Sequence, residues 1–178
     1  MPRHVAFLRA INVGGHVVKM DSLRRLFEGI GHSGVETFIA SGNVIFEAAS
    51  RNAAALERAI EARLEEALGY EVAAFIRSPA ELAAIGRFRP FPGAGVPNGG
   101  TLYVGFLSRE PAREAIRRLE SIESDVDAFR VRGRELYWLI RGGFGDSKLS
   151  GAKLERILGV KATLRNITTV TKLAAKYA

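Results

Sequence analysis

The chain of 178 residues contains no cysteine, so disulfide bonds, thiolate metal ligands and cysteine nucleophiles are excluded. Histidine is scarce as well. The three histidines are His4, His16 and His32, and their positions do not match the spacing of a metal site. We therefore expect no metal centre, and no motif in the sequence calls for a cofactor.

Long apolar runs are missing too. No apolar stretch approaches the roughly 18 residues that a membrane-spanning helix needs. The first residues, MPRHVAFLRAINVGG, lack the long apolar core and the small-residue cleavage site of a signal peptide. These features predict a cytoplasmic protein with no membrane partner. The spacings of a P-loop, a dinucleotide-binding loop and a zinc-protease helix are also absent.

Positive charge is in excess, and it is concentrated near the C-terminus. The net charge is +7, yet residues 1–90 carry 11 Lys and Arg against 10 Asp and Glu. Residues 130–178 carry 11 against 3. A basic region attracts nucleic acids, phosphorylated metabolites or acidic proteins, although many small proteins are basic without a polyanionic partner.

Apolar periodicity predicts the order β-α-β-β-α-β in the first half of the chain. Asp21 and Asn52 are expected to cap the two helices, and Gly31 and Gly69 to end them. The expected strands are residues 4–9, 35–40, 43–48 and 71–76. This is the element order of the ferredoxin-like plait.

The second half repeats this order after a joint. Ser78 and Glu81 form a capping box that opens a short helix, and the Pro- and Gly-rich residues 88–100 read as a linker. The expected strands of the second half are 101–107, 128–132, 134–141 and 160–165, with helices from Pro111, over 149–159 and over 168–177. We predict an α+β fold with a duplicated ferredoxin-like plait. Its domains are residues 1–87 and 101–178, joined by the linker.

Several sequence blocks resemble one known family. They are LRAINVGG (8–15), TFIASGNVIF (37–46), GDSKLS (145–150) and TLRNITTVTKL (163–173). In this order they resemble the bacterial family catalogued as domain of unknown function 1697. The resemblance implies two ferredoxin-like plaits in one chain and no established activity. Ala10 stands where the family usually has glycine, and Ile167 where an aromatic residue is common.

The start of the last expected helix is the sharpest candidate site. Asn166 occupies the N-cap position, and Thr168 and Thr169 lie in the first turn without an acidic residue. Free amide groups and a partial positive charge at a helix start stabilise an anion, and Arg165 and Lys172 add cationic groups. The alternative is an ordinary cap whose hydrogen bonds are local. If a carboxylate of the protein itself occupied this helix start, the hypothesis of an anion-binding site there would fail.

Two further blocks carry polar and cationic residues between flexible glycines. In GFGDSKLSG (143–151), Ser147 and Lys148 could contact phosphate, or the block could be a glycine-rich turn. The loops after the first and second expected strands could also contact a ligand, or they could hold their own turns. Their candidate anion-binding residues are Arg9, Asn12, Gly14, Gly15, Ser41 and Asn43.

Three hypotheses follow for these residues. In the first, the protein binds a phosphorylated or other anionic ligand, either a nucleotide or a nucleic acid. One of the adjacent residues Tyr137 and Trp138 could then stack on a base, unless the sheet is covered on both faces. In the second, an enzyme acts on a small anionic substrate in a cleft between the plaits, with catalytic residues unknown. In the third, the same polar residues bond the two halves together.

Overall fold

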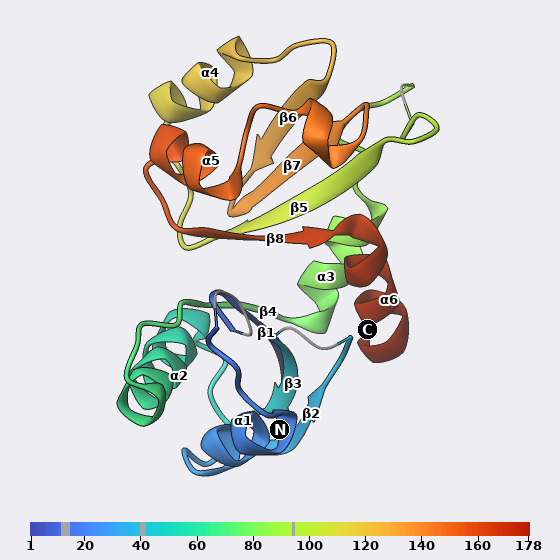
Figure 1. Cartoon of the computed structure of the whole chain (residues 1–178). Coiled ribbons are helices and arrows are strands. Elements are labelled where there is room, and N and C mark those ends of the chain that lie inside the picture. The colour runs from blue at the N-terminus through green and yellow to red at the C-terminus, as the bar shows by residue number, and fades with distance from the viewer. Residues whose placement is uncertain (12–14, 40–41, 94) are drawn as a thin grey trace. The chain divides into compact units, whose positions relative to one another are not determined.

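Each half of the chain forms a four-stranded antiparallel sheet with two helices on one face, as the computed structural model shows (Figure 1). The chain divides into a first unit, residues 1–83 with 173–178, and a second unit, residues 84–172. The structure describes all residues except 12–14, 40–41 and 94. Within those residues, the predicted duplicated ferredoxin-like plait is confirmed.

The first unit follows the expected element order. Its elements are β1 (Arg3–Leu8), α1 (Met20–Glu28), β2 (Ser33–Thr37), β3 (Asn43–Glu47), α2 (Ala53–Leu68) and β4 (Ala74–Arg77), followed by α3 (Pro79–Arg87). The strands lie in the order β2-β3-β1-β4. Leu23 and Phe27 of α1 and Ile60 of α2 pack against one face of this sheet and form the core with it.

The second unit has the same plan. Its elements are β5 (Thr101–Leu107), α4 (Arg113–Ser121), β6 (Asp127–Arg132), β7 (Glu135–Ile140), the 3-10 turn η1 (Phe144–Asp146), α5 (Gly151–Leu158) and β8 (Ala162–Asn166). The last helix, α6 (Ile167–Tyr177), begins in the second unit, and its residues from 173 onward belong to the first. The strand order is β6-β7-β5-β8. Leu119 of α4 and Leu154 and Leu158 of α5 pack against Phe129, Trp138 and other residues of one sheet face.

The duplication extends to the register of the strands. In the first sheet Val5 pairs with Arg77 and Leu8 with Ala74. In the second sheet Val104 pairs with Arg165 and Leu107 with Ala162. Both fourth strands therefore carry an arginine three residues after an alanine, opposite equivalent positions of the first strand, although no residue-level repeat is visible in the sequence.

One edge strand of each sheet, β4 in the first and β8 in the second, is bonded by glutamate side chains of a helix. The carboxylates of Glu61 and Glu57 in α2 each accept a hydrogen bond at 2.9 Å, from the amides of Ala74 and Ile76 respectively. The Glu155 carboxylate in α5 accepts one from the Ala162 amide at 2.8 Å. A bonded edge strand offers fewer groups for pairing with another chain.

Most element boundaries agree with the sequence, and the differences have local causes. Asn52 caps α2 by accepting from the Ala55 amide at 3.1 Å, and Ser78 and Glu81 form the expected reciprocal box at the start of α3. Asp21 is not the cap of α1. The N-cap is Lys19, and Asp21 lies in the first turn, where its carboxylate pairs with Arg24 at 3.1 Å.

The expected domain boundaries stay a prediction. By contacts, residues 84–100 belong to the second unit, so the segment read as a linker lies with the sheet of β5 to β8.

Candidate functional site

The second sheet has one face turned away from α4 and α5. Side chains alternate between the two faces of a strand. Trp138 and Ile140 belong to the core with α4 and α5, so Leu139 lies on the opposite face together with Leu102, its partner on β5. Arg165 pairs with Val104, and it therefore lies on this same face, one row away from Leu102.

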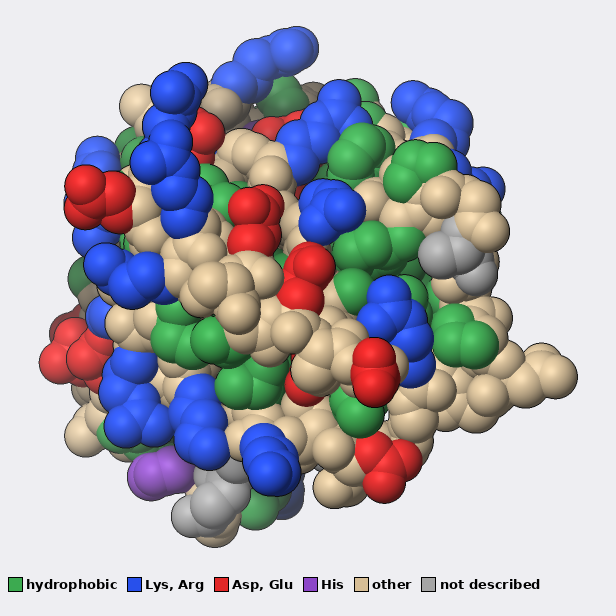
Figure 2. Space-filling view, turned by 90° about the horizontal axis from the view of Figure 1, so that it is seen from above, with side chains coloured by type: hydrophobic (Ala, Val, Ile, Leu, Met, Phe, Trp, Pro, Cys, Tyr) green, Lys and Arg blue, Asp and Glu red, His purple; other side chains and the backbone are tan. Residues whose placement is uncertain are grey.

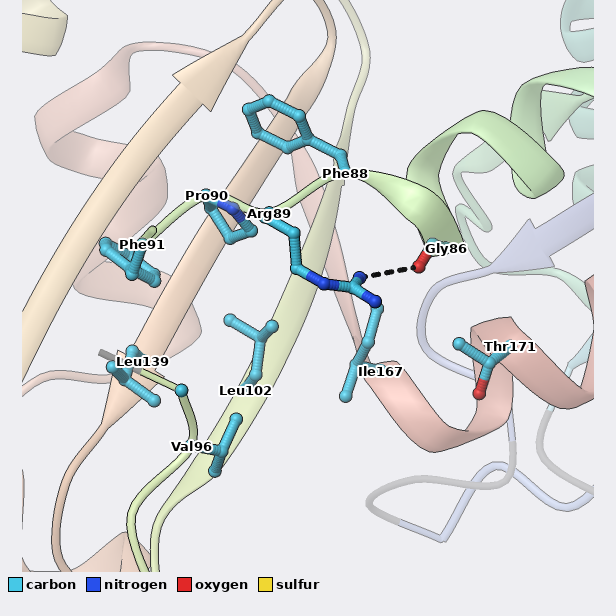
Figure 3. A pocket seen from close by; sticks show the side chains of 11 residues that line it. Gly86, Phe88, Arg89, Pro90, Phe91, Val96, Leu102, Leu139, Ile167 and Thr171 are labelled. Carbon is cyan, nitrogen blue, oxygen red and sulfur yellow. Dashed lines mark hydrogen bonds between the residues drawn. The ribbon is translucent and has the colours of Figure 1, made fainter. Parts of the chain in front are cut away.

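The segment that follows α3 passes over this face and leaves a pocket of about 320 Å³ (Figure 3). The floor of the pocket is formed by Leu102 and Leu139, and one wall by residues of α6. The lining residues are Gly86, Phe88, Arg89, Pro90, Phe91, Gly95, Val96, Leu102, Leu139, Ile167 and Thr171. All of them belong to the second unit.

Arg89 is the charged residue of this lining. Its side chain lines the pocket together with Ile167, and its guanidinium group donates to the carbonyls of Gly86 and Arg87 at 3.4 Å each (Figure 3). Both bonds are long compared with the usual 2.7–3.2 Å. Within the described part of the chain, no carboxylate forms an ion pair with Arg89. The pocket therefore combines apolar walls with an exposed cation.

The start of α6 borders the pocket through Ile167, its first residue. The Asn166 side chain accepts a hydrogen bond from the Thr168 amide at 2.9 Å, so the predicted cap is confirmed. The first turn contains no acidic residue. Thr169 is half-buried, and Thr168 and Lys172 are exposed.

Arg165 precedes this turn and is largely withdrawn from solvent. Burial lowers the pKa of its guanidinium to about 10, so the group remains charged at neutral pH. It donates to the Thr163 hydroxyl at 2.8 Å and to the Leu164 carbonyl at 2.9 Å.

Two carboxylates that could have occupied the α6 start, those of Asp146 and Glu36, have other partners. Asp146 accepts from the Gly143 amide at 2.7 Å, inside its own turn. Glu36 lies 3.7 Å from the ammonium group of Lys176, in the last turn of α6.

The family model for proteins of unknown function, DUF1697, matches residues 1–137 of the chain. The chain belongs to the DUF1697 family. The conserved bacterial protein SP0830 from Streptococcus pneumoniae has a similar structure, with a TM-score of 0.77 and 23% sequence identity. The match covers 99% of this chain and 98% of that one, and it shows the shared fold. No curated protein matches the chain.

Several of the predicted site residues of this DUF1697 protein lie in the first unit. Asn12, Gly14 and Ser41 are outside the described residues. The Asn43 side chain is buried and donates to the Phe38 carbonyl at 3.1 Å, which holds the turn between β2 and β3. The amide of Arg9 donates to the Ala73 carbonyl at 3.0 Å. Gly15 is exposed and has a φ of +86°.

Ser147 belongs to a buried polar network rather than to the pocket. Its hydroxyl lies 2.9 and 3.0 Å from the two carboxylate oxygens of Asp127, to which it donates. One of these oxygens also accepts from the Trp138 indole at 2.8 Å. Ser147 therefore helps to hold the Asp127 carboxylate that accepts from Trp138. Its neighbour Lys148 is exposed.

Stacking on a nucleic-acid base is not available to Tyr137 or Trp138, because they are 2% and 0% exposed. Figure 2 shows Asp and Glu side chains as well as Lys and Arg on the face that it draws. Among the described residues there is no metal-binding cluster of His, Asp and Glu, and none of their helices is long and apolar enough to cross a membrane.

The sequence interpretation missed the residues that build the pocket. Phe88, Arg89, Phe91 and Val96 all lie in the segment read as a linker. Their signal was present in the composition, since two aromatic residues and an arginine are unusual in a solvated linker of Pro and Gly.

Proposed function

We propose that this protein binds a small anionic ligand, phosphorylated or otherwise, at the amino end of α6 in the second unit. The observation that carries the proposal is Arg89, an exposed cation that lines the same pocket as Ile167, the first residue of α6, and has no described carboxylate as its ion-pair partner. A guanidinium group binds carboxylate or phosphate with two parallel hydrogen bonds.

The predicted residues around α6 support the same conclusion. The first turn lacks an acid, and the Asn166 cap engages the amide of Thr168. Other amides of the turn remain to be satisfied by water or by a ligand. Lys172 and Arg165 add positive charge near this helix start, where a bound anion is stabilised.

A small molecule agrees better with these observations than a nucleic acid. The aromatic residues that could have stacked on bases are buried. The remaining predicted contacts, from Arg9 to Asn43 and from Ser147 to Lys148, are not needed for this proposal.

The test is a titration of the ¹⁵N-labelled protein with phosphate, pyrophosphate and nucleoside monophosphates at low ionic strength, followed by amide chemical shifts. We expect saturable shifts at residues 166–171 that weaken with added salt, because salt screens an exposed charge pair. Arg89→Gln and Lys172→Gln should weaken binding. Arg87→Gln is the matched control, because Arg87 is exposed and lies at the end of α3 outside the pocket lining.

Single-stranded RNA in the same titration tests the alternative partner. Shifts at residues 166–171 with RNA alone, or equal effects of Arg87→Gln and Arg89→Gln, would contradict the proposal.

A further inference from the structure

The walls of the pocket in the second unit are mainly apolar, and this restricts the class of ligand. Leu102, Leu139, Phe91, Val96 and Ile167 contribute hydrocarbon surface. Val96 is 49% exposed, although a valine gains free energy from burial. A simple inorganic anion would leave all of this surface in contact with water.

The two aromatic residues of the lining contact side chains of the sheet. The Phe88 ring lies 5.0 Å from the ring of Tyr137, and the Arg132 guanidinium lies 4.4 Å from the centre of the same Phe88 ring. The Arg130 guanidinium lies 5.4 Å from the centre of the Phe91 ring. Cation–π contacts of this kind stabilise one ring orientation. The two aromatic rings of the lining are therefore held by contacts with residues of the sheet.

The volume sets the size of the ligand. A cavity of about 320 Å³ accommodates about ten non-hydrogen atoms if each occupies about the 30 Å³ share of a water molecule. A complete nucleotide has about twice that number of atoms and would extend outside. A medium-chain or aromatic acid would fill the pocket.

The polar end of the ligand follows from the polar groups of the lining. Arg89 is its charged residue, and the Thr171 hydroxyl donates to the Thr168 carbonyl at 3.0 Å, inside α6. The guanidinium fork thus provides the charged donor at the pocket, and it suits a planar carboxylate.

We propose that the natural ligand of this pocket is a small carboxylic acid with an apolar body of about ten non-hydrogen atoms, whose carboxylate pairs with Arg89. This inference rests on the proposed function and specifies its ligand class. Sites for small molecules commonly have this composition, with predominantly apolar walls and a few placed polar groups.

The experiment compares octanoate, octanamide and acetate by calorimetry and by amide shifts of the full chain. Octanoate and octanamide have the same number of non-hydrogen atoms, but octanamide has no charge, and acetate keeps the carboxylate without the apolar body. We expect octanoate to bind at least about tenfold more tightly than either. It should exceed octanamide because a charge-assisted pair is roughly twice as strong as a neutral hydrogen bond, and it should exceed acetate because its alkyl chain buries apolar surface.

Four variants test which residues provide the charged contribution and the apolar contribution to binding. Arg89→Gln should abolish the preference for octanoate over octanamide, while Arg87→Gln should leave it unchanged. Val96→Asp should weaken both ligands, because it places a carboxylate in the apolar wall. Val17→Asp is its control, since Val17 is 81% exposed and belongs to the first unit.

The outcomes separate the inference from the proposed function. Equal binding of octanoate and octanamide, or loss of octanoate binding in the two control variants, would overturn the carboxylic-acid assignment. Binding of phosphate or pyrophosphate at residues 166–171 without any binding of octanoate would also overturn it, while the anion-binding function would stand. Failure of every anion would overturn both.

Discussion

Replacing Ala10 by glycine is expected to stabilise the protein. Ala10 follows β1 and has a φ of +65°, in the left-handed region that glycine adopts without steric cost. The neighbouring residues prevent relaxation. The amide of Arg9 donates to the Ala73 carbonyl at 3.0 Å, and the Ile11 side chain is 2% exposed in the core. The backbone conformation of residue 10 is therefore imposed by the packing on both sides.

Three contributions determine the change in the free energy of unfolding, one in favour of glycine and two against it. A left-handed conformation costs a residue with a Cβ atom roughly 1–2 kcal/mol. Glycine loses about 0.5–1 kcal/mol more backbone entropy on folding than alanine, and removal of a half-buried methyl group costs a few tenths more at about 25 cal/mol per Å². Ala10→Gly should therefore raise the free energy of unfolding by about 0.5 kcal/mol, or the melting temperature by roughly 1–2 °C for a chain of this length.

The control is the same substitution at an ordinary helical position. Ala62 is exposed in the middle of α2, where glycine costs about 1 kcal/mol relative to alanine. Calorimetry and urea denaturation of the two variants should therefore give shifts of opposite sign. A loss of stability in Ala10→Gly as large as that in Ala62→Gly would refute the argument that residue 10 is strained.

Two further predictions concern buried polar groups. Burial lowers the pKa values of both His4 and His32 below the usual 6.5, so the unfolded chain binds more protons and the free energy of unfolding should fall as the pH decreases below about 6.5. Urea denaturation at pH 7.5 and 5.5 measures this, with His4→Gln and His32→Gln each reducing the pH dependence, and a stability that is constant over this interval would contradict it. Asp127→Ala should cost about 2 kcal/mol because two buried donors lose their acceptor; chemical denaturation that gives the same loss for the exposed Asp125→Ala would contradict a specific role of the network.

The sequence predicted the fold well because its signals are local. Asn52 and Asn166 cap helices, and Gly69 ends α2 in the left-handed conformation, as their residue types indicate. Because both halves show the same order of elements, the sequence then predicted a duplicated ferredoxin-like plait. The equivalent register of Val5 with Arg77 and Val104 with Arg165 could not be predicted, since pairing joins segments more than 60 residues apart.

The site was harder to predict because a polar residue looks the same whether its partner is a ligand or another part of the chain. Asn43 and Ser147 were candidates on chemical grounds, yet Asn43 bonds the Phe38 carbonyl and Ser147 bonds Asp127, 20 residues away. Asp127 itself is buried and accepts hydrogen bonds from both Ser147 and Trp138. Only the folded structure distinguishes these cases.

The pocket results from how the two faces of the second sheet are covered. Two amphipathic helices cover one face, and their leucines, such as Leu119 and Leu154, pack against it. An irregular segment covers part of the other face. Its prolines and glycines cannot form a helix and supply little or no side chain, so Phe88 and Phe91 reach the sheet while space remains between them and α6. A composition that indicates a linker in the sequence thus produces a cavity when the segment lies on a sheet, and the arginine in that segment determines which ligands the cavity favours.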